Sequence, residues 1–277
     1  MPDVVLKNRI RLRAGCEFAY DLASAVPALV QVTARRGEVA HVLRETWETH
    51  PHARMDDLSD LYGNTIHRAT LGPGIARIRY DATVEVPAEP DAARPDARQH
   101  AIEELPAGAL HYLLASRYCE SDVLAPVAAD LFGSAPAGWP LAQAVCDWVH
   151  ANLGFRYGSS DSTTTARDVY ERREGVCRDF AHLFITFCRA LNLPARYVFG
   201  YLPDLFVEPA PTPMDFYAWA EVYLGGGWWT FDPRNNQRRA GRVVIGRGRD
   251  AVDVAMMTTW GRAELVGFEV WAEEVAP

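Results

Sequence analysis

The chain has 277 residues, of which 49% are hydrophobic, and a formal net charge of −8 at pH 7. A chain of this size can form one large domain or two smaller ones, each with a well-filled core. The negative charge argues against nucleic acid or an anionic membrane surface as the partner.

The five cysteines are scattered, odd in number and without CxxC spacing. This pattern predicts reduced thiols in a cytoplasmic protein, with neither a disulfide framework nor a zinc site. The first residues lack the basic start and apolar middle of a signal peptide. No apolar run approaches the roughly 18 residues of a membrane span, so no membrane association is expected.

The first third of the chain has the pattern of β-strands. Residues 9–36, 63–70 and 75–86 contain alternating apolar and polar positions, and glycine and proline residues separate the runs. Alternation with a period of two is typical of antiparallel strands with one solvated face. We therefore predict a small antiparallel β-sandwich over residues 1–88.

A segment rich in proline and charge follows at residues 87–98. Such a composition favours an exposed linker, and we assign residues 89–105 to it. The remaining residues, 106–277, are predicted to form a second domain.

The second domain shows helical spacing first and strand patterns later. The predicted helices cover residues 107–118, 121–132 and 139–153, a short helix at 168–171, and a deeply buried helix from Cys177 to 191. The predicted strands cover residues 196–202, 218–224, 228–231 and 242–246, with a glycine turn at 225–227. Helices followed by an antiparallel sheet define an α+β fold.

Cys177 is the first candidate for chemistry. Gly175 permits a tight turn into the helix, and Cys177 falls in the first helical turn. There the helix dipole and unpaired N–H groups can stabilise a thiolate or a tetrahedral oxyanion. The alternative is a buried structural cysteine, which the residue type alone favours.

Several motifs occur together in one order along this region. They are residues 175–183 (GVCRDFAHL), 188–201 (CRALNLPARYVFGY), 218–224 (AWAEVYL) and 227–233 (GWWTFDP). Together they resemble the core of the bacterial transglutaminase-like family, strongly so from residue 155 to 232. Residues 1–86 also resemble the β-rich region that accompanies this domain.

The resemblance implies a papain-like cysteine site in which a Cys attacks an amide or ester carbonyl. A His then moves the proton, and an Asp orients the His. Carried onto this sequence, Cys177 is the nucleophile and Asp232 the orienting residue, while the position of the His is occupied by Tyr217. The sequence contains no acidic loop of the EF-hand type, and we expect no metal and no cofactor.

Tyr217 is a poor substitute for the histidine, because a phenol with an ordinary pKa of about 10 stays protonated near neutral pH. No histidine follows His182, and five residues of helix turn His182 away from Cys177, so we interpret it as a core histidine. Asp232 could accept a hydrogen bond from the Tyr217 hydroxyl, or act only as a turn residue before proline.

Two aromatic residues are further candidates. Tyr157 lies in a loop that resembles the one leading to the nucleophile helix, where it could line the cleft and support the oxyanion. The alternative is that this Ser/Thr-rich loop only caps the next helix. Trp219 is a candidate for the cleft, either as part of its wall or as a substrate contact, and the core is the alternative.

Two functional hypotheses follow. In the first, the chain is a catalytically impaired protein, or pseudoenzyme, whose cleft binds a peptide or protein amide. In the second, it is an active cysteine amidase, protease or acyltransferase that uses water, Asp232 or Tyr217 for the missing step.

Overall fold

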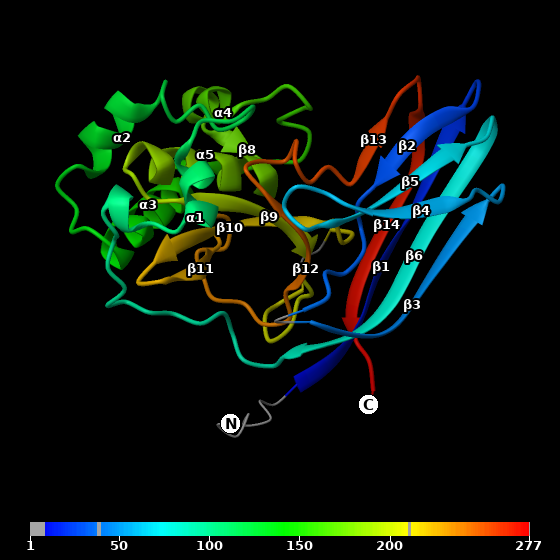
Figure 1. The fold of residues 1–277 in the computed structure, drawn as a ribbon, viewed down its shortest axis with the longest axis horizontal. Coiled ribbons are helices and arrows are strands. Elements are labelled where there is room, and N and C mark those ends of the chain that lie inside the picture. Colours follow the sequence, from blue (N-terminus) through cyan, green and yellow to red (C-terminus); the bar gives the residue numbers. More distant parts are fainter. Residues whose placement is uncertain (1–8, 38–39, 210–211, 277) are drawn as a thin grey trace.

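The computed structural model describes residues 9–37, 40–209 and 212–276, and it has two halves (Figure 1). One half consists of two β-sheets, and the other consists of helices gathered around a third sheet. The predicted α+β class, with a β-rich region before a helical region and an antiparallel sheet, is confirmed.

The β half contains two antiparallel four-stranded sheets. The first has the order β14 (Glu264–Glu274), β1 (Arg9–Leu22), β6 (Gly74–Pro87), β3 (His41–His50). The second has the order β13 (Met257–Thr259), β2 (Val26–Val30), β5 (Thr65–Leu71), β4 (Met55–Ser59). Both sheets contribute to one hydrophobic core.

Strand β6 shows why the alternation in the sequence folds this way. Every second residue from Ala76 to Val86 is almost fully buried, and the residues between them are at least partly exposed. Because successive side chains of a strand point to opposite faces, the strand buries one face and solvates the other. The predicted β-sandwich therefore has its core on the apolar face of β6.

The last two strands return to the β half. β14 pairs with β1 from Leu12 to Asp21, and β13 pairs with β2. Residues 257–274 thus complete the two sheets of the first half, whereas the sequence placed them in the second domain. The proposed division of the chain at residues 88 and 106 stays a prediction.

The contact between β1 and β14 requires a glycine. A Cβ at Gly15 would clash with the Tyr80 carbonyl oxygen and lie 2.6 Å from the ring of Trp271, an indole that also contacts Arg79. We expect Gly15→Ala to destabilise the fold by about 1–3 kcal/mol, because overpacking forces the backbone or the ring to shift. Chemical denaturation would measure this change.

Gly72→Ala is the matched control for this substitution. A Cβ at Gly72 meets nothing within 4 Å. The free energy of unfolding of Gly72→Ala should therefore stay close to that of the wild type. Equal stability of the two variants would show that the contact around Gly15 has room for a side chain.

The helical half is built around a four-stranded antiparallel sheet. Its order is β11 (Gly227–Phe231), β10 (Tyr217–Leu224), β9 (Ala195–Tyr201), β12 (Val243–Gly248). The central helix is α5 (Cys177–Ala190), which is buried along almost its whole length. Ala218, Ala220 and Val222 share its core, whereas Tyr217 and Trp219 belong to a separate cluster on the other face of β10.

The other helices surround α5. They are α1 (Ala107–Leu110), α2 (Ala125–Phe132), α3 (Trp139–Asn152) and α4 (Ala166–Arg172), with 3-10 turns η1 (Ile102–Glu104) and η2 (His111–Leu113). In place of the single helix predicted over residues 107–118, the chain forms only α1 and η2. Helix α2 begins at Ala125, later than the predicted start at residue 121. Two short parallel strands, β7 (Gly154–Phe155) and β8 (Glu174–Gly175), lie before α5.

The predicted linker is mostly exposed and irregular, but several of its residues form hydrogen bonds with the second half. Asp91 accepts hydrogen bonds from Arg242, and the Ala97 carbonyl accepts one from the Trp139 N–H at 2.9 Å. Residues 89–105 are therefore docked against the second half, and we call this segment the strap. Among the described residues, no helix combines the length and apolar character that crossing a bilayer requires.

Candidate active site

A cavity of about 380 Å³ lies at the start of α5 and β10. Its lining includes Cys177, Tyr217, Tyr157, Asp215 and Arg234. A larger cavity of about 980 Å³ lies in the β half beside β3 and β4, and none of the predicted site residues lines it. The smaller cavity is therefore the candidate active site.

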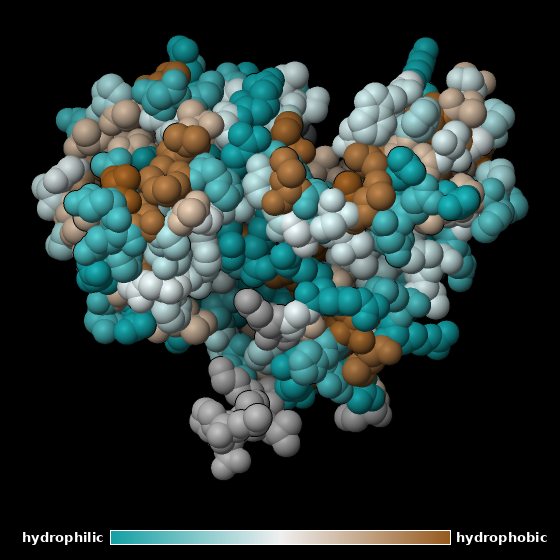
Figure 2. Space-filling view, in the orientation of Figure 1, coloured by the Kyte–Doolittle hydropathy of each residue, from teal (hydrophilic) through white to brown (hydrophobic). Residues whose placement is uncertain are grey.

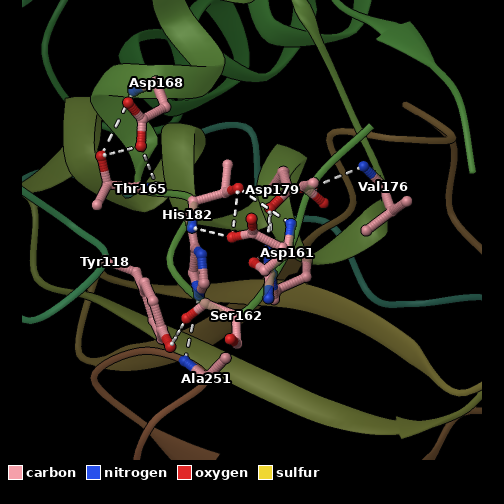
Figure 3. Close-up of polar contacts among 12 residues, drawn as sticks. Tyr118, Asp161, Ser162, Thr165, Asp168, Val176, Asp179, His182 and Ala251 are labelled. Atoms are coloured by element: carbon pink, nitrogen blue, oxygen red, sulfur yellow. Dashed lines mark hydrogen bonds and ion pairs between the residues drawn. The ribbon is translucent and has the colours of Figure 1, made fainter. Parts of the chain in front are cut away.

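The start of α5 is held in place by Asp179. This fully buried carboxylate accepts hydrogen bonds from the Val176 N–H at 2.8 Å and the Ser160 hydroxyl at 2.5 Å (Figure 3). A Cβ at Gly175 would come within 2.6 Å of the Asp179 Cβ. The glycine thus allows the close turn that places Cys177 at the first position of the helix.

Cys177 is the least buried cysteine of the chain. Of the five cysteines, all in described parts of the structure, the other four are buried and Cys177 is partly exposed. Its Sγ lies 3.9 Å from the Phe216 carbonyl oxygen. Burial raises the pKa of the Cys177 thiol to about 11, although Arg234 and the Ala218 N–H act in the opposite direction.

Tyr217 and Asp232 form a buried pair beside the thiol. The Tyr217 hydroxyl donates a hydrogen bond to the Asp232 Oδ1 at 3.2 Å, which is one of the two alternatives that the sequence left open for Asp232. Burial raises the pKa of Tyr217 well above its ordinary value, and the Asp232 carboxylate acts in the same direction. The phenol is therefore a hydrogen-bond donor that stays protonated.

Arg242 completes the contacts of Asp232 and was not found by the sequence reasoning. It donates to the Asp232 Oδ2 at 2.8 Å and to both carboxylate oxygens of Asp91 at 3.0 and 2.8 Å. The Asn235 side chain reaches the same Asp232 oxygen at 3.2 Å. Because Asp91 lies in the strap and Arg242 lies just before β12, about 150 residues later in the chain, no sequence spacing signals this network.

Arg234 is a second residue that the sequence reasoning missed. Its guanidinium lies 3.9 Å from the ring centre of Phe155 and 5.2 Å from that of Tyr217. It brings a cation to the wall of the cavity next to Cys177. Its position two residues after Asp232, in the turn that ends β11, is the only hint that the sequence offers.

The structure separates the two aromatic candidates. Tyr157 is 49% exposed and lines the cavity beside Cys177, as expected for a cleft residue. Trp219 is 1% exposed, and the Arg242 guanidinium lies 4.8 Å from its ring centre. Trp219 therefore supports Tyr217 from within the core and is not among the residues that line the cavity.

The Ser/Thr-rich loop after Tyr157 also caps the next helix, which was the alternative role considered for it. Thr165 caps α4, because its side chain accepts a hydrogen bond from the Asp168 N–H while the Asp168 carboxylate accepts one from the Thr165 N–H (Figure 3). Asp161 accepts hydrogen bonds from the backbone and hydroxyl of Thr163, both at 2.7 Å. These contacts fix the loop that presents Tyr157.

His182 is a core residue, as the sequence predicted. It is fully buried, its ring lies between those of Tyr118 and Tyr197, and its Nε2 accepts a hydrogen bond from the Ala251 N–H at 3.2 Å (Figure 3). Burial lowers the pKa of His182 to about 3, so the ring is neutral. None of the eight histidines, all in the described ranges, lines the cavity.

No constellation for a metal is evident at this site. Within the described residues, no three His, Cys, Asp or Glu side chains are grouped so that they could hold a metal ion.

Comparison with known proteins identifies the family of this chain. The profile of the Transglutaminase-like superfamily matches residues 126–233. A crystal structure described as a candidate cysteine protease from Cytophaga hutchinsonii is 31% identical in sequence, covers 98% of this chain and 92% of that chain, and superposes with a TM-score of 0.88. The chain belongs to the transglutaminase-like superfamily.

Curated relatives match a smaller part of the chain. An uncharacterized protein of Mycobacterium leprae is 34% identical over 116 residues, which is 40% of this chain and 41% of the relative. An uncharacterized protein of Mycobacterium bovis is 37% identical over 118 residues, which is 38% of this chain and 37% of the relative. The chain thus matches about two fifths of the length of these relatives.

Proposed function

We propose that this chain is a catalytically impaired transglutaminase-like protein whose cavity binds a peptide or protein amide. In this proposal Cys177 and Asp232 hold the nucleophile and orienting positions of a Cys-His-Asp triad, and Tyr217 holds the position of the histidine. The observation that carries the proposal is the hydrogen bond from the Tyr217 hydroxyl to Asp232. The group at the base position donates a proton where catalysis requires a group that accepts one.

The electrostatics of the thiol support the same reading. A nucleophilic cysteine needs a lowered pKa, whereas burial raises the pKa of Cys177 to about 11. The nearby Asp215 carboxylate raises the pKa of the thiol further. At neutral pH the sulfur is therefore almost entirely a protonated thiol, a weak nucleophile.

Turnover of a p-nitrophenyl ester and a peptide p-nitroanilide tests the proposal. We expect the wild type and Cys177→Ala to show the same background rate. Tyr217→His should gain a rate about 100-fold above background, since a positioned base contributes roughly 10²–10⁴-fold. The double variant Cys177→Ala/Tyr217→His is the control, because it should lose this gain.

The second candidate is an active cysteine amidase, protease or acyltransferase. It is favoured by the partial exposure of Cys177 in the cavity and by the description of the Cytophaga hutchinsonii relative as a candidate cysteine protease. Asp215 is a base that the sequence reasoning did not consider, since it lines the same cavity and burial raises its pKa.

In that mechanism the thiol proton passes to Asp215 as the sulfur bonds to the carbonyl carbon. The proton then goes to the leaving amine as the C–N bond breaks, and water cleaves the thioester. A wild-type rate above that of Cys177→Ala would establish this function and overturn the impaired reading. Asp215→Asn, Tyr217→Phe and Asp232→Asn would then identify the base, because only its replacement should abolish turnover.

A cytoplasmic location stays part of the proposal. All five cysteines are free, and free thiols persist in reducing compartments. Immunodetection of the chain in cell fractions would test this, and recovery outside the cytoplasm would contradict it.

A further inference from the structure

A third cavity, of about 440 Å³, lies where the two halves of the molecule meet. Four arginines line it: Arg35, Arg36, Arg196 and Arg247. The aromatic residues Tyr62, Tyr112 and Trp228 form further parts of its wall. Figure 2 shows that hydrophilic residues gather along this junction. Such a concentration of cations is unexpected in a chain with a net charge of −8.

Two of these arginines share one carboxylate. Arg247 donates to both oxygens of Glu221, at 2.9 and 3.0 Å, and Arg196 donates to the Glu221 Oε2 at 2.6 Å. The side chains of Arg196 and Arg247 are each 16% exposed, and that of Glu221 is 8% exposed. The Arg196 guanidinium also lies 4.0 Å from the ring centre of Trp228, which fixes its plane at the cavity wall.

Arg35 brings a third guanidinium to the same place. Its Nη1 donates to the Gly63 carbonyl oxygen at 2.8 Å and to the Asn64 side-chain oxygen at 2.7 Å, both neutral acceptors. The Arg35 N–H donates to the Val244 carbonyl oxygen at 2.7 Å, which ties this segment to β12. Arg35 is therefore positioned by the fold of both halves.

The cations outweigh the carboxylates around Arg35. Burial lowers the pKa of its guanidinium, and Arg247 and Arg196 lower it further, against smaller opposing effects of Asp60 and Glu221. Arg36, at the exposed rim, is paired with Glu45. Holding like charges together costs free energy, and an anion bound among them would recover it.

We propose that this cavity binds a small phosphate-bearing anion. Guanidinium groups match the geometry of phosphate oxygens and bind them through paired, charge-assisted hydrogen bonds. The volume is within the range of small-molecule sites. Because residues of both halves supply the arginines, the bound anion bridges the β half and the helical half.

Isothermal titration calorimetry with inorganic phosphate, at about 50 mM salt to limit screening, tests this proposal. We expect one site in the wild type and a Kd at least about tenfold higher in Arg35→Gln, the loss expected for one charge-assisted contact. Arg68→Gln removes the same charge from an exposed residue of β5 outside the cavity, and its Kd should match the wild type. Equal binding by the wild type and Arg35→Gln would overturn the proposal.

A further variant and further ligands test the same proposal. Arg36→Gln alters an exposed residue, so it should fold even if Arg35→Gln does not, and it should weaken binding severalfold. Glycerol 3-phosphate distinguishes a phosphate monoester from free phosphate as the preferred ligand. No binding up to about 10 mM phosphate, or binding of succinate instead, would overturn the assignment. Cys177→Ala should bind phosphate normally, so this outcome is independent of activity at Cys177.

Discussion

Iodoacetamide should alkylate Cys177 with a midpoint near pH 11, because burial raises the pKa of the thiol to about 11. The reactive thiolate is present above this pKa and is lost as the pH falls through it. At pH 7.5 the thiolate fraction would be about 300-fold lower than for a free thiol with a pKa of about 8.5. The greater nucleophilicity of a more basic sulfur recovers part of this, leaving a rate roughly 20-fold lower.

Tyr217→His should move this midpoint below the free-thiol value of about 8.5. An imidazolium beside the sulfur stabilises the thiolate, and Asp232 is placed to hold the imidazole as it now holds the phenol. Tyr217→Phe is the matched control, since it removes the hydroxyl without supplying a cation and should leave the midpoint near that of the wild type.

Mass spectrometry identifies which cysteine is alkylated. We expect the modification at Cys177, because the other four cysteines are buried. Burial also raises the pKa values of Cys16 and Cys119 to about 12. A wild-type midpoint well below 8.5 would show an activated thiol and contradict the impaired reading. Identical titrations of the His and Phe variants would show that position 217 does not control the sulfur.

Arg242→Met should destabilise the protein by about 3–5 kcal/mol, the loss expected when one partner of a buried ion pair is removed. The Arg242 and Asp232 side chains are 6% and 1% exposed, so the carboxylate would lose its cation where water cannot replace it. Asp91 would lose the same partner, while its hydrogen bonds with the Arg239 backbone would remain. For a chain of this size we expect the melting temperature to fall by about 10 °C.

Arg238→Met provides the comparison for this variant. Arg238 is exposed, lies in the same segment and donates a long hydrogen bond of 3.4 Å to the Asp91 carbonyl oxygen. Thermal denaturation of both variants should show a large shift for Arg242→Met and a small one for Arg238→Met, because exposed contacts contribute little. Similar shifts would show that the buried pairs add no special stability.

Local sequence was enough to predict the site where its residues lie close along the chain. The turn at Gly175 and the apolar residues after it predicted a buried helix beginning at Cys177, and α5 begins there. The family motifs also placed Tyr217 and Asp232, which are neighbours in the structure because β10 and β11 form a hairpin. In these cases the residues lie close together in the sequence, or the family motif already indicates that they are neighbours in the fold.

The same reasoning failed where contacts join distant segments. Strands β13 and β14 pair with β2 and β1, which lie more than 220 residues earlier in the chain. Nothing in the local pattern of β13 and β14 therefore placed them in the first two sheets. The strap residue Asp91 was read as part of an exposed linker, although it binds Arg242. A short polar segment looks the same in sequence whether or not a distant cation is paired with it.

The sequence by itself determined the α+β class and the buried helix that begins at Cys177, because periodicity and local motifs specify these features. Only the tertiary structure decided that Tyr217 donates to Asp232, that Arg242 holds this carboxylate, and that Arg35 meets Arg196 and Arg247 in one cavity. The physical reason is that burial and charge act through space. The protonation of a thiol and the affinity of a cavity for an anion therefore depend on which distant segments the fold brings together.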